Sequence, residues 1–275
     1  MKVSAEQPKI IVVGSSSIDL VLNTSFHPEP NETVIAQKSE TFFGGKGANQ
    51  AVGTARLGAS TFFIGCVGMD PYGQQILRNL VDENVNVGFV HEDLDHATGT
   101  AYVTAAHGKN AIVVVPSANY CLEPKHLESA ERFFSTADLV LTQLEIYASP
   151  AARISEEILD YASFIVAKSN ELSIIFGEES REKILRKYPN KLFVRDDANS
   201  TIYHNGSEMK YHRNDPEDMP NKMGMGDAFT SGFSIALCHG NEIDDCVKFG
   251  NDVSLKVAQK RGSQTGLPKL KDFGL

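Results

Sequence analysis

The chain has 275 residues, 41% of them hydrophobic, which is enough for one large α/β domain or two small ones with a substantial core. Its 26 Lys and Arg residues and 35 Asp and Glu residues give a net charge of -9, and no basic run is present, so nucleic acid is not expected as a partner. No apolar run approaches the roughly 20 residues that span a bilayer, so no membrane partner is expected either.

The cysteines indicate the compartment. Cys66, Cys121, Cys238 and Cys246 form no C-x-x-C motif and no Cys/His metal spacing. The first residues, "MKVSAEQPKIIVVG", lack an apolar region of signal-peptide length. We therefore expect reduced thiols and a cytoplasmic location.

Strand and helix patterns alternate from the start of the chain. Residues 9–14, "KIIVVG", predict a buried strand that ends in a turn. Residues 46–59, "KGANQAVGTARLGA", predict a helix with Gly58 at the C′ position. Residues 60–68 predict a second strand, and Asp70 then reads as the N-cap of a helix whose first residue is Pro71.

The alternation continues to the C-terminal third. Further strands are predicted at residues 137–145, 163–168 and 190–194, and helices at about 123–135, 179–188, 227–239 and 243–260. Such a pattern predicts an α/β fold with a doubly wound, mostly parallel sheet covered by helices on both faces.

Two stretches contain strands without helices between them. They are residues 18–24 with 32–43, and residues 87–91 with 99–115, the second turning at 107–110. They predict a small antiparallel β lid. Since no linker or repeat divides the chain, we expect a single domain over residues 1–275, with lid strands within about 18–43 and 87–115.

The segment "NKMGMGDAFTSGF" at residues 221–233 places an acid behind two glycines. Taken alone, Asp227 is best explained as a helix N-cap. However, Gly224 and Gly226 would let a ligand approach the backbone, and a helix N-terminus attracts anions. A carboxylate beside an anion site suits an alcohol that attacks a phosphoryl group, because the carboxylate orients the alcohol and accepts its proton.

The segment "FFGGKGANQ" at residues 42–50 is a second glycine-rich stretch. It is not a P-loop, because Gly47 follows Lys46 where Ser or Thr is required. It is either a glycine turn with a solvated lysine, or a bare loop in which a small polar ligand meets backbone groups, Lys46 and Asn49. Asp19 and Glu145 lie at strand ends, where open α/β sheets bind ligands. Singly each acid would be solvated, but together these side chains would suit a sugar.

Four segments in this order carry a family resemblance: "GSSSIDLVL", "FFGGKGANQAVGTARLGA", "GCVGMDPYG" and "GMGDAFTSGF". Together they resemble the ribokinase branch of the PfkB family of carbohydrate kinases. The resemblance implies a ribokinase-like fold with a β lid that mediates a homodimer. It also implies transfer of a phosphoryl group from ATP, with Mg²⁺ and a monovalent cation such as K⁺, to the primary hydroxyl of a sugar. D-ribose is expected, because the G-G-K-G-A-N segment is more similar to ribokinases than to fructokinases or nucleoside kinases.

The resemblance also assigns roles by position. Asp227 would be the catalytic base, with Gly224 and Gly226 in its anion hole. Asp19, Gly45, Lys46, Asn49 and Glu145 would hold the sugar. Asn170 would lie near the nucleotide phosphates, and Asn251 near the adenine.

The chain departs from the family pattern mainly on the nucleotide side. The N-x-x-E motif linked to Mg²⁺ ends in Ser173, and Glu171 stands two residues early. The phosphate loop reads "RDDANST", whose Asp196 and Asp197 would repel phosphate unless a cation intervenes.

Three further departures lie elsewhere. Residues 221–223 replace the D-T-T of the monovalent-cation site, and Ser17 replaces an asparagine of the sugar pocket. The stretch from Glu145 to Asn170 is too short for the extra helix and strand that ribokinases have there, so one βα unit is expected to be absent.

These departures leave two functions open. The intact G-x-G-D motif favours an active sugar kinase. The alternative is a catalytically weak or inactive sugar-binding or regulatory protein. A Rossmann-type oxidoreductase is disfavoured, because "GSSSID" after the first strand lacks G-x-G-x-x-G.

Overall fold

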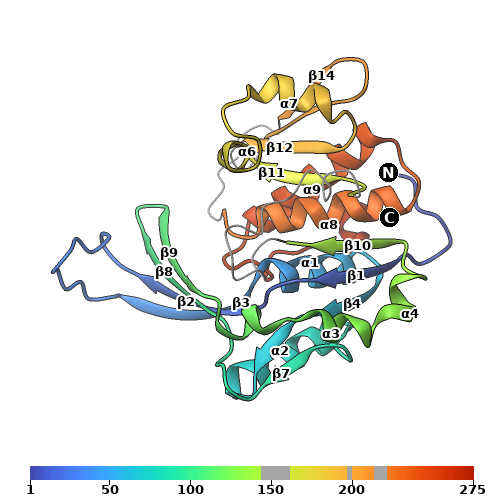
Figure 1. Ribbon diagram of the computed structural model, residues 1–275. Coiled ribbons are helices and arrows are strands. Elements are labelled where there is room, and N and C mark those ends of the chain that lie inside the picture. Colours follow the sequence, from blue (N-terminus) through green and yellow to red (C-terminus); the bar gives the residue numbers. More distant parts are fainter. Residues whose placement is uncertain (144–161, 197–199, 214–221) are drawn as a thin grey trace.

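The computed structural model describes residues 1–143, 162–196, 200–213 and 222–275. Helices cover both faces of two four-stranded sheets, and a third four-stranded sheet projects from this body as an arm (Figure 1). Within the described residues, none of the helices is long and apolar enough to cross a membrane.

The first sheet is entirely parallel, in the order β10-β1-β4-β6. Its strands are β1 (Lys9–Val13), β4 (Ser60–Ile64), β6 (Val85–Asn86) and β10 (Leu139–Thr142). Alternate residues of β1 point to opposite faces. Ile10 and Val12 join the main core, whereas Ile11 and Val13 join a smaller cluster on the other face.

Short and long helices cover this sheet. They are α1 (Lys46–Arg56), α2 (Pro71–Asp82), α3 (Pro124–Glu128) and α4 (Glu131–Phe134). α1 and α2 contribute Ala51 and Ile76 to the main core, while the α3–α4 region packs Leu127 and Phe133 against the opposite face. The sheet is therefore buried on both sides, as its continuous apolar strands predict.

The second sheet has the order β11-β12-β13-β14. Its strands are β11 (Ile165–Lys168), β12 (Leu192–Asp196), β13 (Ser200–His204) and β14 (Met209–Arg213), and its helices are α6 (Ser169–Phe176), α7 (Arg181–Lys187), α8 (Met225–Cys238) and α9 (Ile243–Ala258). On one face Val194 packs with Leu172 and Ile184, from α6 and α7. On the other face, the ring centre of Phe193 lies 4.7 Å from that of Phe233 in α8. Both rings belong to the main core, which also covers the first sheet.

The doubly wound α/β class is confirmed, with differences in detail. Apart from the lid, the described strands fall into two four-stranded sheets and one two-stranded sheet rather than a single sheet. The helix expected at 123–135 is two short helices. The interruption lies at Ala130, which has φ −103° and ψ 3° and is buried between them. Helix α6 and the hairpin of β13 and β14 were not predicted. The absent βα unit falls in a stretch that lies largely outside the described residues.

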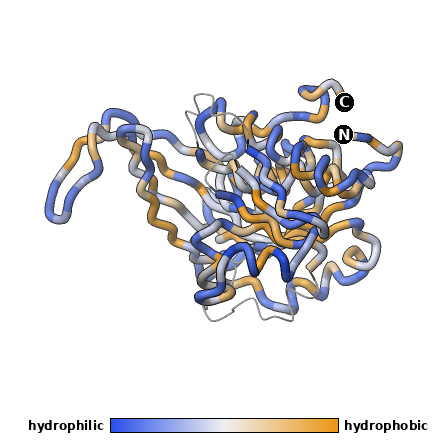
Figure 2. The backbone as a smooth tube through the Cα atoms, turned by 90° about the horizontal axis from the view of Figure 1, so that it is seen from above, coloured by the Kyte–Doolittle hydropathy of each residue, from blue (hydrophilic) through white to orange (hydrophobic). Residues whose placement is uncertain are grey.

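The projecting arm corresponds to the predicted lid. Its order is β3-β2-β8-β9, with β2 (Ser17–Asn23), β3 (Lys38–Gly44), β8 (Thr100–Ala106) and β9 (Lys109–Val115). The β8–β9 hairpin turns at His107 and Gly108, with φ angles of 49° and 70°, as a two-residue turn with two left-handed residues requires. Hydrophobic segments run along the arm as well as through the body (Figure 2).

Residues 87–91 were expected in the lid, and this expectation is wrong. Val87 and Val90 pack against the main core, and His91 begins β7 (His91–Asp93). β7 pairs in parallel with β5 (Cys66–Gly68) in a separate two-stranded sheet. Core packing therefore holds this segment on the body, and only the part from β8 onward belongs to the lid.

Asp70 joins the body to the lid. It is the N-cap of α2, as predicted, and its Oδ1 accepts hydrogen bonds from Gly73 N at 2.8 Å and Thr98 Oγ1 at 2.7 Å. Its Oδ2 accepts from Thr98 N at 2.7 Å, just before β8. Burial alone would raise the pKa of Asp70, but the bonds from Thr98 and Gly73 outweigh it and hold that pKa below its usual value.

We predict that Asp70→Ala lowers the free energy of unfolding at neutral pH by about 1–3 kcal/mol, because a helix cap and the tie to Thr98 are both lost. The lowered pKa of Asp70 means that its stabilisation is complete above the ordinary carboxyl pKa and disappears as the pH falls through the folded value. Urea unfolding should therefore show that the difference in free energy of unfolding between wild type and Asp70→Ala becomes smaller as the pH falls from neutral to acidic. Asp82→Ala, at the exposed end of the same helix, is the control. A difference in free energy of unfolding that stays constant or grows as the pH falls would contradict the prediction.

Candidate active site

The start of α8 differs from the expectation that Asp227 is its N-cap. The N-cap is Gly224, with φ 74° and ψ −1°, and Asp227 is the third helical residue. This left-handed conformation favours glycine. A Cβ at Gly224 would also lie 2.8 Å from the carbonyl oxygen of Ser263. Asp227 therefore lies in the first turn of the helix but does not cap it.

Two amides of α1 hold the carboxylate of Asp227, which is only 8% exposed. Asn49 Nδ2 donates to Oδ2 at 2.9 Å, and Gln50 Nε2 donates to Oδ1 at 3.1 Å. Burying a carboxylate is costly unless such donors surround it. The first turns of α1 and α8, which are far apart in the sequence, are thus joined at this acid.

The amides continue outward as two chains. Asn49 Oδ1 accepts from Gln264 Nε2 at 3.1 Å, and Gln264 Oε1 accepts from Asn79 Nδ2 at 2.9 Å. On the other side, Gln50 Oε1 accepts from Gln143 Nε2 at 2.7 Å. An ionised carboxylate can only accept hydrogen bonds, so it fixes the direction of every amide in both chains.

The sequence contains no local signal for most of these partners. Gln264 and Asn79 lie in predicted loop and helix positions with nothing to link them to Asp227. Gln143 is different, because it stands at the carboxyl end of a predicted strand, where α/β sheets bind ligands. A Cβ at Gly14 would lie 1.9 Å from Gln143 Oε1, so the glycine that ends the first predicted strand makes room for this side chain.

Open space lies beside the first turn of α8. A Cβ at Gly226 would meet no described atom within 4 Å. The first backbone N–H groups of a helix have no acceptor within the helix, and they carry partial positive charge. The position next to Asp227 is therefore suited to an anion such as a phosphate.

The G-G-K-G turn serves packing within the protein. A Cβ at Gly44 would lie 2.2 Å from the carboxylate of Asp19, and one at Gly45 would lie 2.4 Å from Ser16 Cα. A Cβ at Gly47 would lie 2.7 Å from the Cα of Gly14. These contacts explain the three glycines of the turn without a ligand. That Gly45 also contacts a sugar stays a prediction.

The remaining sugar-side residues gather near the start of α1. Asp19 is 5% exposed, and its Oδ1 accepts from Ser17 Oγ at 2.8 Å, so the serine that departs from the family pattern orients this acid. Lys46 is the first residue of α1 and is half-buried. Asn49 follows one turn later and contacts Asp227. Glu145 lies outside the described residues.

The nucleotide-side acids are already engaged. Asn170 is exposed near the start of α6, and Glu171 Oε2 accepts from Lys168 N at 2.8 Å, toward the end of β11. Asp196 forms an ion pair with Arg181 and accepts a hydrogen bond from Ser169 Oγ. Arg181 is thus a cation that offsets the charge of Asp196. Asp197 lies outside the described residues.

Asn251 lies in the protein interior, on α9. It is fully buried, and its Oδ1 accepts from Arg195 Nη1 at 3.1 Å and Thr201 Oγ1 at 3.2 Å. Its Nδ2 donates to the carbonyl of Val247 at 2.9 Å. The carboxamide therefore has no exposed surface, and the expected position of Asn251 near the adenine stays a prediction.

Arg195 is a buried cation beside α8 that was not predicted. Its guanidinium carbon lies 4.4 Å from the centre of the Phe229 ring, and Nη2 donates to Ser254 Oγ at 3.2 Å. Ser254 Oγ in turn donates to the carbonyl of Met225, the first residue of α8. Burial lowers the pKa of Arg195 to about 10, which leaves it charged at neutral pH.

The chain is similar to known carbohydrate kinases over nearly its whole length. The family described as pfkB family carbohydrate kinase matches residues 7–144 and 143–270. A ribokinase of Bacillus subtilis (strain 168) is 34% identical over 280 residues, which cover 94% of this chain and 96% of the relative. A ribokinase of Lactococcus lactis is 31% identical over 289 residues, with 96% and 95% covered.

Solved structures show the same fold. The ribokinase of Thermotoga maritima superposes with a TM-score of 0.82 at 26% identity, covering 97% of this chain and 98% of that one. A ribokinase of Arabidopsis thaliana, complexed with ribose and ATP, superposes with a TM-score of 0.80 at 25% identity, covering 97% of both chains.

We predict that Asn49→Asp destabilises the protein by about 1–3 kcal/mol at neutral pH, because it replaces a donor to Asp227 with a second carboxylate. Two carboxylates in contact share a proton, which raises the pKa of the pair in the folded state, so the deficit should shrink as the pH falls below that raised value. Urea unfolding across acidic and neutral pH measures this. Gln74→Glu, which is exposed on α2, should show no such deficit. Equal stability of Asn49→Asp and wild type at neutral pH would refute the directed amide network.

Proposed function

Because the chain belongs to the pfkB family of carbohydrate kinases, we propose that it transfers the γ-phosphoryl group of ATP to the primary hydroxyl of a pentose, D-ribose, forming ribose 5-phosphate and ADP. The observation that carries the proposal is the carboxylate of Asp227, which lies in the first turn of α8 beside the open space at Gly226 and is held by two amides of α1. The site thus combines a proton acceptor with an anion-binding helix terminus.

The choice of D-ribose rests on the relatives. Ribokinases of Bacillus subtilis and Lactococcus lactis match nearly the whole chain, and the ribokinase of Arabidopsis thaliana was solved with ribose and ATP. We assign the sugar hydroxyls to Asp19, Lys46, Asn49 and Glu145, with the backbone of Gly45. Carboxylates that accept and an ammonium and an amide that donate are the groups that a polyol requires.

In the proposed reaction, the primary hydroxyl oxygen of the sugar attacks the γ-phosphorus. Its proton passes to Asp227 as the new O–P bond forms and the bond from the γ-phosphorus to the ADP oxygen breaks. Asn49 and Gln50 keep the carboxylate in one orientation, and the N-terminal N–H groups of α8 stabilise charge on the transferring group. Positioning supplies most of the rate in such a reaction.

The nucleotide side requires its own assignments. We place the phosphates of ATP between the start of α8 and Asn170. The pairing of Asp196 with Arg181 removes one source of repulsion. Since Glu171 is bonded to Lys168 N, we propose that Mg²⁺ is held chiefly by phosphate oxygens and water, as is usual for this ion. A monovalent cation such as K⁺ near residues 221–223 is a further proposal.

The kinase proposal predicts ADP formation from Mg-ATP that depends on D-ribose. Asp227→Asn should lower kcat by about 10²–10⁴-fold, because the proton acceptor is lost, while ribose still raises the melting temperature. Asp245→Asn, exposed in the first turn of α9, is the matched control and should keep full activity. A panel of pentoses and hexoses tests the choice of sugar.

The same assay decides the rival function. If a sugar raises the melting temperature of the wild type but no ADP forms, the chain is a sugar-binding or regulatory protein. If ADP forms but Asp227→Asn remains as active as the wild type, the assignment of the base is wrong.

We also propose that the lid mediates a homodimer. β9 is an edge strand of the lid, and all of its residues are exposed. Its apolar side chains include Val113, 65% exposed, and Val114, 57% exposed, and Val113 pairs with Tyr102, itself 47% exposed. An exposed apolar edge strand is a liability unless another chain covers it.

The dimer proposal predicts that light scattering gives the wild type twice the 30.0 kDa mass of the chain. Val113→Asp should dissociate the dimer, because it buries a charge in an apolar contact. Asn110→Asp, exposed on the same strand, is expected to leave the mass unchanged. A monomeric wild type at assay concentrations would rule the proposal out.

A further inference from the structure

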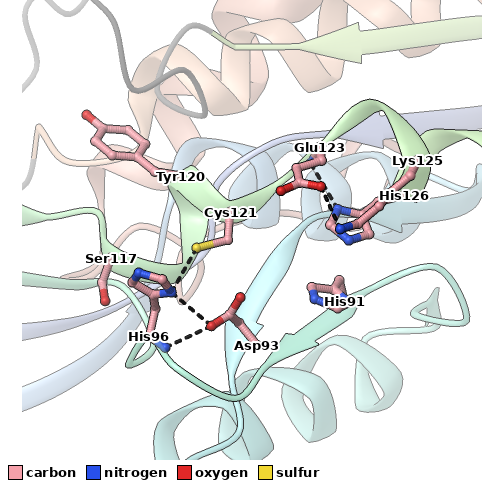
Figure 3. A pocket seen from close by; sticks show the side chains of 9 residues that line it. All are labelled: His91, Asp93, His96, Ser117, Tyr120, Cys121, Glu123, Lys125 and His126. Carbon is pink, nitrogen blue, oxygen red and sulfur yellow. Dashed lines mark hydrogen bonds and ion pairs between the residues drawn. The ribbon is translucent and has the colours of Figure 1, made fainter.

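A cavity of about 510 Å³ lies near the base of the lid (Figure 3). None of its lining residues belongs to the candidate active site. They are rich in metal-binding side chains and comprise His91, Asp93, His96, Ser117, Tyr120, Cys121, Glu123, Lys125 and His126. The kinase proposal gives this cavity no role.

Three donor atoms converge in the cavity. His96 Nδ1 lies 3.0 Å from Asp93 Oδ1 and 3.2 Å from Cys121 Sγ, as the dashed lines in Figure 3 mark. Zinc bonds of about 2.0–2.3 Å in a tetrahedron place neighbouring donor atoms about 3.3–3.7 Å apart. Only small adjustments would let one ion bind all three.

A second set of donors shares Asp93. The sulfur of Cys66, a ring nitrogen of His91 and a carboxylate oxygen of Asp93 all lie within 4.8 Å of one another. Cys66 is 1% exposed, so its thiol lies in the protein interior behind the cavity. The carboxylate of Asp93 therefore stands between a buried thiol on one side and the His96–Cys121 pair on the other.

We propose that the cluster of Asp93, His96 and Cys121 is a zinc site, in which these three side chains are ligands and water takes the fourth position. Thiolate and imidazole ligands select zinc over Mg²⁺ and Ca²⁺, which prefer oxygen. Three protein ligands with a water in the fourth position are a common coordination of zinc in proteins.

The electrostatics are consistent with this assignment. The hydrogen bonds from His96 lower the pKa of Asp93 to about 2, so this ligand is ionised. Burial, aided by the charges of Cys121 and Asp93, raises the pKa of Cys66 to about 12, and burial also raises the pKa of Cys121. A cysteine binds zinc as the thiolate, so the thiol of Cys121 must lose its proton when the ion binds.

His126 forms part of the wall of the cavity. Its Nδ1 accepts from Glu123 N at 2.9 Å, which leaves the ring proton on Nε2. That buried Nε2 has no hydrogen-bond partner among the described residues, and the ring stacks on His91 at 4.1 Å. A buried donor without an acceptor is costly.

The position of the ligands indicates what the metal does. His96 precedes β8, and Cys121 ends the 3₁₀ segment (Ser117–Cys121) that follows β9, so the pair brackets the β8–β9 hairpin of the lid. Asp93 belongs to β7 of the body. One ion would therefore clamp both ends of this hairpin to the body.

The test uses the full chain, stripped of metal with a chelator and kept reduced with a phosphine that does not bind metal. We expect one Co²⁺ per chain, with a thiolate charge-transfer band and the strong visible bands of tetrahedral Co²⁺, and displacement by Zn²⁺. Cys121→Ser should lose the charge-transfer band and weaken binding at least about tenfold. His96→Asn, whose side chain is 57% exposed, is a second variant that should fold and bind weakly.

Cys238→Ser, at the end of α8 and outside the cluster, is the matched control and should bind like the wild type. The proposal is overturned if the wild type binds no Co²⁺ or Zn²⁺, or if Cys121→Ser and Cys238→Ser bind alike. The clamp is tested by hydrogen exchange, in which Zn²⁺ should slow exchange in β8 and residues 117–121, and unchanged exchange would refute it. No readout depends on kinase activity, so failure here is distinct from failure of the proposed function.

Discussion

The candidate active site depends on one constraint: a buried carboxylate accepts hydrogen bonds but cannot donate them. Asp227 therefore requires nitrogen atoms from Asn49 and Gln50, and this requirement sets the direction of the amides behind them. Because these donors lie in α1 and the acid in α8, satisfying the carboxylate also fixes how the two helices meet. The same contact places the acid beside the N-terminus of α8. Core packing, helix orientation and the proposed chemistry therefore share a single set of hydrogen bonds.

Much of the fold could be predicted because its signals are local. Asp70 followed by Pro71 marks the start of α2, and the glycine at position 58 marks the end of α1, where its φ is 98°. The G-x-G-D motif likewise located the start of α8. The exact first residue of α8 could not be predicted. The N-cap is Gly224 and not Asp227, because Gly224 adopts the left-handed conformation. The motif therefore indicates roughly where a helix begins, and the φ and ψ angles of the backbone decide which residue is its N-cap.

Partners that are distant in sequence escaped prediction for a different reason. The family resemblance gave Asn251 a place near the adenine, but it did not predict that Asn251 accepts a hydrogen bond from Arg195 and that both side chains are buried. The cysteines were judged by their spacing along the chain, whereas Cys66 and Cys121 approach the same aspartate only because β5, β7 and the segment after β9 lie side by side. Tertiary packing creates both arrangements, and no local pattern encodes either.

The placement of Asp19 on β2 has a mechanical consequence. The strand that begins the lid also carries this acid, and β2 runs parallel to β8 along the arm (Figure 1). The carboxylate cannot move independently of the strand, because it rests on the α-carbon of Gly44 at the end of β3. Tilting of the arm must therefore carry the acid with it. For the proposed sugar site, the position of one sugar-binding carboxylate and the tilt of the arm would be coupled, so a contact that holds the arm in place would also affect sugar binding.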